Sequence, residues 1–249
     1  MRPPTAQEML DAWERGLAES PVQRALALVS AACPETAPED LARESVGRRD
    51  ARLLALREWA FGPRLVSVTD CPSCGERLET SFDVAEIRIQ EPAAAPAEPL
   101  SVSVEGYELT FRLPDSRDLA ALAEPSPPIG VDGARRRLFE RCLVAARSPE
   151  GEETALNSLP GEALEAVTDG MAAADPQADV ELSLQCAACG HAWLAPFDIA
   201  SFFWTEVDAW ARRLLYEIHV LARAYGWREG DVLALSPWRR SAYLELIGA

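Results

Sequence analysis

The chain has 249 residues, which is enough for one or two domains with a sizeable buried core. It carries 40 acidic and 24 basic side chains, and the formal net charge of −16 disfavours binding to the phosphate backbones of DNA or RNA. No N-terminal apolar run resembles a signal peptide, and no apolar run approaches the ~18 residues typical of a membrane span. We therefore expect a cytoplasmic protein without membrane insertion, in a compartment that keeps thiols reduced.

Residues 1–63 show helical patterns. Thr5 can cap a first helix, Pro21 can begin a second, and Ser45 can cap a third, because Ser, Thr and Pro favour helix starts. A Gly-Pro pair then ends the third helix. The apolar side of this third helix would carry Leu53, Leu54, Leu56 and Trp59.

Two matching cysteine segments are the most specific feature of the sequence. Cys71 and Cys74 form a CxxCG motif, as do Cys186 and Cys189, and in both segments a Phe-Asp pair begins eight residues after the second cysteine. Zinc takes four thiolates in a tetrahedron, and a CxxC turn presents two sulfurs to one side of the metal. The sequence therefore predicts one structural zinc site with four cysteine ligands and no open position for water or substrate.

Apolar and polar residues alternate on both sides of each cysteine pair, a period typical of half-buried strands. The alternation leads into the first pair through Val66 and Val68, and into the second through Leu182 and its neighbours. Each CxxC turn is therefore expected at the tip of a β-hairpin, as in a zinc ribbon, within residues 64–90 and 176–200. The gap between the two segments is far longer than the ~15–20 residues of a compact ribbon, so the ribbon would be interrupted.

Three other interpretations of the cysteines remain open: a disulfide pair, a thioredoxin-like redox motif, and buried free thiols. In a redox CxxC motif the second cysteine usually opens a helix, whereas here Gly75 and Gly190 follow and strand patterns continue. His191 is expected to be a strand residue or a hydrogen-bond donor near the site, and His219 a helix residue. The remaining cysteines are expected to be small buried residues within helices: Cys33 and Cys142.

The segment between the two CxxC motifs shows secondary-structure patterns of its own. Residues 91–99 read as a Pro/Ala linker, and the alternation over 100–111 around a Glu-Gly turn predicts a β-hairpin. Asp115 or Ser116 can cap a short helix, and a Pro-rich loop follows at 124–130. Two further helices would carry Leu138, Cys142 and Ala145, and Leu164, Val167 and Met171.

The C-terminal segment is the most strongly amphipathic part of the chain. Apolar residues recur at spacings of three or four from Val207 to Tyr225, and Ser236 followed by Pro237 is a strong start for a last helix. These faces either pack on the protein's own core or meet a partner, and interfaces favour Trp and Tyr. The candidate partner-binding residues are Trp204, Trp210, Trp227, Trp238 and Tyr243.

The expected fold class is α+β, mostly helical, with an interrupted zinc ribbon and a small β-hairpin. No Gly-rich phosphate loop, HExxH motif or other catalytic set is visible, so we do not expect an enzyme. The expected regions are residues 1–63 (N-terminal helices), 64–90 (first zinc knuckle), 91–175 (inserted hairpin and helices), 176–200 (second zinc knuckle) and 201–249 (C-terminal amphipathic helices).

Three blocks of the sequence, at residues 45–63, 111–119 and 230–246, resemble the baseplate hub assembly proteins of contractile phage tails. Related proteins occur in phage-derived extracellular contractile injection systems. The resemblance implies a non-enzymatic structural or chaperone-like assembly protein, stabilised here by structural zinc, that binds baseplate, hub or spike subunits. Such a protein would act in the cytoplasm or be incorporated into an extracellular particle.

Two alternatives to this function remain open. The first is a zinc-ribbon adaptor in transcription or nucleic-acid handling, in which the run Arg135, Arg136 and Arg137 would form a local basic patch. The overall acidic charge weighs against it, because counterion release requires a basic surface. A redox enzyme that uses the CxxC motifs comes third.

Overall fold

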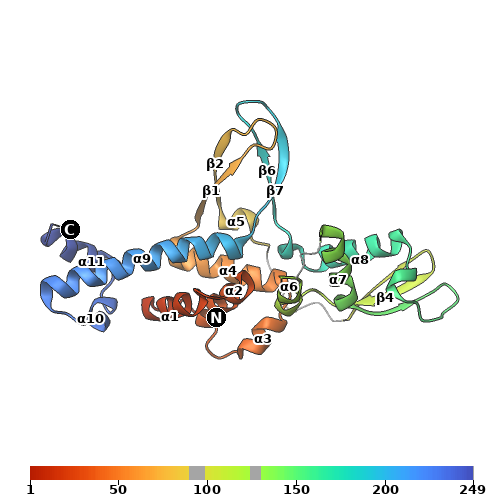
Figure 1. The fold of residues 1–249 in the computed structure, drawn as a ribbon, viewed down its shortest axis with the longest axis horizontal. Helices are drawn as coiled ribbons and strands as arrows, with labels where there is room; N and C mark the ends of the chain where they lie inside the picture. Colours follow the sequence, from red (N-terminus) through yellow and green to blue (C-terminus); the bar gives the residue numbers. More distant parts are fainter. Residues whose placement is uncertain (90–98, 124–129, 249) are drawn as a thin grey trace. The chain divides into compact units, whose positions relative to one another are not determined.

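A computed structural model describes residues 1–89, 99–123 and 130–248. The chain divides into two compact units, the first made of residues 1–34 with 200–249 and the second of residues 35–199 (Figure 1). Apart from their last residues, the linker and the loop predicted at 91–99 and 124–130 lie outside the described residues. None of the described helices is long and apolar enough to cross a membrane.

The first unit is helical, and its helix starts follow the capping signals in the sequence. Thr5 and Glu8 form a capping box at the start of α1, and the Ser20 and Ser236 hydroxyls accept hydrogen bonds from the first turns of α2 and α11. The helices of this unit are α1 (Ala6–Gly16), α2 (Pro21–Ala32), α9 (Ile199–Tyr225), α10 (Glu229–Leu233) and α11 (Pro237–Leu246).

The long helix α9 buries most of the apolar stripe that the sequence predicts. Val207, Leu214 and Leu221 are buried, whereas Tyr225 at the end of the stripe is 38% exposed. Two tryptophans of this unit contact polar side chains. The Trp13 indole N–H donates a hydrogen bond to Asp208. The Arg24 guanidinium lies 4.9 Å from the ring centre of Trp204, where a cation is attracted to the aromatic face.

The second unit contains two long hairpins and a three-stranded sheet. Helix α4 was predicted correctly from its Ser45 cap, but Trp59 on it is 45% exposed, so its assignment to the apolar side was wrong. The helices are α3 (Pro38–Arg43), α4 (Val46–Phe61), α5 (Val84–Ile87), α6 (Ser116–Ala123), α7 (Val131–Cys142) and α8 (Gly161–Ala174). The hairpin strands are β1 (Arg64–Asp70), β2 (Arg77–Asp83), β6 (Glu181–Gln185) and β7 (Ala192–Pro196).

The inserted sheet has one strand more than the predicted hairpin. Strands β3 (Leu100–Val104), β4 (Tyr107–Phe111) and β5 (Leu143–Arg147) pair antiparallel in the order β3-β4-β5. The prediction that Ala145 continues a helix from Leu138 was wrong, because α7 ends at Cys142. The pairing of β5 with β4 places Ala146 opposite Leu109 in the core of this module, and this tertiary contact outweighs the helical pattern.

The start of α4 is where several segments of the second unit meet. The Val46 N–H donates to the Pro114 carbonyl at 3.0 Å, and the Gly47 N–H donates to the buried Asp175 carboxylate at 2.8 Å. A carboxylate is stabilised at this position because the N-terminus of a helix carries a partial positive charge. Two residues further along, Gln177 accepts from the Ile89 N–H at 2.7 Å, so residues 175–177 tie the start of α4 to the segment just after α5.

We expect Gly47→Ala to destabilise the protein by about 2 kcal/mol, in the usual range for overpacking. An added Cβ would lie 2.6 Å from the Asp175 Cγ and 2.8 Å from the Ala178 nitrogen, so the carboxylate would have to leave the helix end. Urea unfolding measures the change. Gly161→Ala is the matched control, because an added Cβ there meets nothing within 4 Å. Equal losses in the two variants would contradict this account.

Candidate metal centre

The two hairpins present their inner side chains by strict alternation. In the first hairpin Leu65 lies opposite Phe82 and is fully buried, so every second residue from Leu65 faces inward. Val66 and Val68 therefore point outward and are 48% and 46% exposed. The prediction that these two valines form the half-buried face was wrong, because a period of two allows either parity and the buried Leu65 decides which one is used.

The second hairpin repeats this arrangement and packs against the first. Leu184 lies opposite Trp193 on its half-buried side. Phe82 and Phe197, which hold the same place in the two sequence motifs, meet edge to face with ring centres 5.3 Å apart. The two hairpins stand side by side with their tips together (Figure 1).

The two cysteine turns have the same backbone geometry. The Gly75 N–H donates to the Cys71 carbonyl and the Gly190 N–H to the Cys186 carbonyl, both at 2.9 Å. Both glycines have positive φ values, 73° and 75°, which residues with a side chain rarely adopt. The glycine that follows each CxxC motif therefore closes the turn that aims the two cysteine sulfurs in one direction.

The four predicted ligands come together at the hairpin tips. The Cys71 and Cys189 sulfurs lie 3.8 Å apart, the Cys74 and Cys186 sulfurs lie 3.7 Å apart, and all four sulfurs lie within 4.8 Å of one another. A disulfide requires about 2.05 Å, so these thiols are free. A tetrahedron with zinc–sulfur bonds of ~2.3 Å has sulfur–sulfur edges of about 3.8 Å. The arrangement therefore fits a tetrahedral metal ion.

The electrostatics of the cluster also favour a cation. Burial raises the pKa of the Cys71 thiol, but hydrogen bonds from the backbone N–H groups of the turn outweigh this effect and lower the pKa to about 7. The pKa of Cys74 rises to about 12 although the Glu76 N–H lowers it, because the other sulfurs and burial disfavour a second thiolate. Four thiolates at these distances repel one another unless a positive ion lies between them.

The other cysteines and both histidines lie outside the cluster. Cys33 and Cys142 are buried, as predicted. His191 lies just before β7 and its ring stacks on Trp193, and His219 lies on the exposed side of α9. Over residues 1–89, 99–123 and 130–248, the four-cysteine cluster is the one group of three or more potential ligands close enough to hold a metal.

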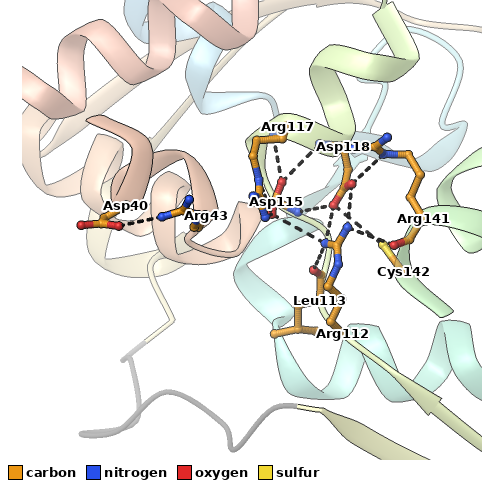
Figure 2. A network of polar contacts seen from close by, with 9 residues as sticks. All are labelled: Asp40, Arg43, Arg112, Leu113, Asp115, Arg117, Asp118, Arg141 and Cys142. Atoms are coloured by element: carbon orange, nitrogen blue, oxygen red, sulfur yellow. Dashed lines mark hydrogen bonds and ion pairs between the residues drawn. The ribbon is translucent and has the colours of Figure 1, made fainter. Parts of the chain in front are cut away.

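A second polar cluster lies where the inserted sheet joins the rest of the second unit (Figure 2). Asp118 is fully buried, and both of its carboxylate oxygens accept from the Arg112 guanidinium, at 2.6 and 2.8 Å. Arg141 donates to the same carboxylate at 2.7 Å, and the Asp115 N–H donates at 3.0 Å. Asp115 in turn accepts from the backbone N–H groups of Arg117 and Asp118, which completes the cap of α6.

This cluster has a structural role. Arg112 follows β4, Asp118 lies in α6 and Arg141 lies in α7, so one buried carboxylate joins three elements. Burial raises the pKa of Asp118, but the hydrogen bonds from Arg112, the Asp115 N–H and Arg141 outweigh burial and lower the pKa to about 2. The sequence indicates Asp115 as a capping residue but carries no signal for the network, because Arg112 and Arg141 lie 29 positions apart in the chain.

The predicted partner-binding aromatics lie in the first unit, and their exposure differs. Trp238 on α11 is 78% exposed. Trp227 and Tyr243 pack against each other, with ring centres 4.9 Å apart, and both are half-buried. Trp204 and Trp210 are half-buried on α9, where Trp204 also fills the space beside Gly16.

Comparison with known proteins gives a match to a protein family. The model of a protein family described as T4 bacteriophage base plate protein matches residues 17–204. No curated protein and no solved structure matches the chain. The match includes all of the second unit, with both hairpins and the polar cluster, together with part of the first unit.

We expect Asp118→Asn to lower the stability of the protein at neutral pH by roughly 2 kcal/mol, the free energy that corresponds to lowering the pKa from 3.8 to about 2. The folded-state pKa lies below the unfolded-state value, so this stabilisation is present above about pH 4 and is lost as the pH falls towards 2. Unfolding free energies measured across this range should fall less steeply in the variant. Asp40→Asn, in the exposed pair with Arg43, is the control and should change little. Parallel pH profiles for wild type and Asp118→Asn would disprove that the ionised Asp118 carboxylate stabilises the fold.

Proposed function

The chain belongs to the T4 bacteriophage base plate protein family, and we propose that it is a non-enzymatic structural or assembly protein for the baseplate hub of a contractile phage tail-like particle. The family match over residues 17–204 is the observation that carries this proposal. The particle would be assembled in the cytoplasm, and the protein would bind other baseplate, hub or spike subunits either during assembly or as a resident component.

The buried polar groups support a non-enzymatic function. Three buried carboxylates of the second unit serve helix ends and ion pairs: Asp175 binds the start of α4, Asp115 caps α6, and Asp118 binds Arg112 and Arg141. The four cysteines offer a complete ligand set, and a four-coordinate site leaves no position for a substrate or an activated water.

We further propose that the cysteine cluster binds one structural zinc ion. Thiolate sulfur suits Zn²⁺, and the observed sulfur–sulfur distances of 3.7 and 3.8 Å suit its tetrahedral geometry. The ion would fasten the first hairpin to the second across more than 100 intervening residues. Each hairpin has only two strands, which are marginally stable alone, so metal binding would contribute directly to folding.

The C-terminal helices are the proposed partner surface. The first unit carries 10 acidic and 9 basic residues and the second carries 30 and 15, so nearly all of the net charge belongs to the second unit. Exposed aromatic residues are enriched at protein interfaces, and a low net charge avoids repulsion from a charged partner. Trp238 and Leu246 are separated by about two turns of α11 and are 78% and 76% exposed. Trp204, Trp210, Trp227 and Tyr243 would support this surface from their half-buried positions.

Protein purified without added metal should contain about one zinc ion per chain, measured by elemental analysis. Cys186→Ser leaves three sulfur ligands, so we expect it to lose zinc and to melt at a lower temperature than wild type. Cys33→Ala, in the first unit and outside the cluster, is the control and should retain the metal. A metal-free wild-type protein with an unchanged melting temperature in strong chelator would rule out a structural zinc site.

Trp238→Ala should weaken co-purification with co-expressed baseplate or hub subunits while leaving the melting temperature unchanged, because this side chain is 78% exposed. Trp59→Ala, which removes an exposed tryptophan from α4 in the second unit, serves as the control. If both variants retain the partner, the interface lies elsewhere. If no baseplate subunit binds the wild-type protein at all, the proposed function itself fails.

A further inference from the structure

A pocket of about 350 Å³ lies in the inserted module, between α7, the segment that leads into α8 and the first turns of α8. Its apolar lining includes Phe139 and Leu159, which are buried, and Leu164, which is half-buried. Arg135 and Arg136 also line it, and both side chains are exposed. The pocket shares no residue with the cysteine cluster or with the proposed C-terminal partner surface.

The Arg135 guanidinium lies against the aromatic ring of Phe139. It lies 5.8 Å from the ring centre of Phe139, where a cation is attracted to the aromatic face. Its only side-chain hydrogen bond within the described residues is a long one, 3.4 Å, to the Thr168 hydroxyl. An arginine guanidinium binds a carboxylate through two parallel hydrogen bonds, and no carboxylate of the described chain fills this role for Arg135.

Among the residues that the structure describes, the acidic side chains of the pocket form no ion pair with this arginine. Asp132 and Glu165 also line the cavity, yet within the described residues neither forms an ion pair with Arg135 or Arg136. Arg136 binds Asn157 and, at 3.3 Å, Glu140, and the latter pair is about half exposed on both sides. Exposed pairs of this kind contribute little and are readily exchanged for a better partner.

We propose that this pocket binds a segment of a partner polypeptide in which an apolar side chain stands next to an acidic one. The apolar side chain would enter between Phe139, Leu159 and Leu164, and the carboxylate would bind Arg135 at the mouth. The volume lies at the lower end of the ~300–1,000 Å³ range of ligand pockets, so it suits one or two side chains rather than a whole cofactor. The identification of the partner as a baseplate subunit rests on the proposed function. The recognition of an apolar side chain next to an acidic one does not depend on that function.

Amide-detected NMR titration of the full chain with three short peptides tests the proposal at constant ionic strength. The peptides are acetyl-Leu-Glu-amide, acetyl-Leu-Gln-amide, which lacks the charge, and acetyl-Ala-Glu-amide, which lacks the apolar anchor. We expect the Leu-Glu peptide to shift the pocket resonances and to bind at least about fivefold more tightly than either of the others, a difference of about 1 kcal/mol.

Arg135→Ala should remove the preference for Glu over Gln and leave the weaker Leu-Gln binding unchanged, which shows that the pocket is intact. Arg137→Ala is the matched control, since Arg137 belongs to the same basic run but does not line the pocket. Equal binding of the Glu and Gln peptides, equal effects of the two arginine variants, or no binding of any peptide would each overturn the proposal. None of these outcomes bears on the baseplate function, because the titration uses the isolated protein.

Discussion

The convergence of four sulfur atoms at the tips of two hairpins is the constraint on which the second unit depends. Each hairpin is a two-stranded sheet with open edges, and such a sheet is marginally stable alone. The two hairpins stabilise each other by packing face to face, through Phe82 and Phe197 away from the tips and through the cysteine cluster at the tips. A contact between residues so far apart in sequence closes a very long loop, although the entropic cost of closure grows only logarithmically with its length.

The residues between the two hairpins are held by polar contacts at a few points. Asp175 binds the start of α4, Gln177 binds the segment just after α5, and Asp118 joins the sheet to α6 and α7. Buried charges are tolerated only when their partners are complete, and these carboxylates receive N–H donors from arginines or helix starts. The same few contacts therefore fix where the inserted module leaves the ribbon and where it returns.

The local signals in the sequence were sufficient for the ribbon tips and for most helix starts. The spacing of the cysteines, the glycines after them and the Ser and Thr caps are all short-range features, and the structure confirms them. The sequence was insufficient where packing decides. Which alternate residues of β1 face inward depends on the burial of Leu65, and β5 forms a strand because it pairs with β4. Arg112 and Arg141 come together because both bind Asp118. The pocket beside α7 had no local signal except the arginine run.

The division of the chain determines the order in which the two units are completed during translation. The second unit occupies one continuous stretch, residues 35–199, whereas the first is completed only by residues 200–249. Domains generally fold as units while the chain emerges from the ribosome. The ribbon segment is therefore translated before the rest of α9, and helices α1 and α2 remain without α9 until the whole second unit has been translated. The exposed tryptophan of α11 follows the ribbon in the sequence, so a newly made chain cannot present that surface before the residues of its cysteine cluster have been translated.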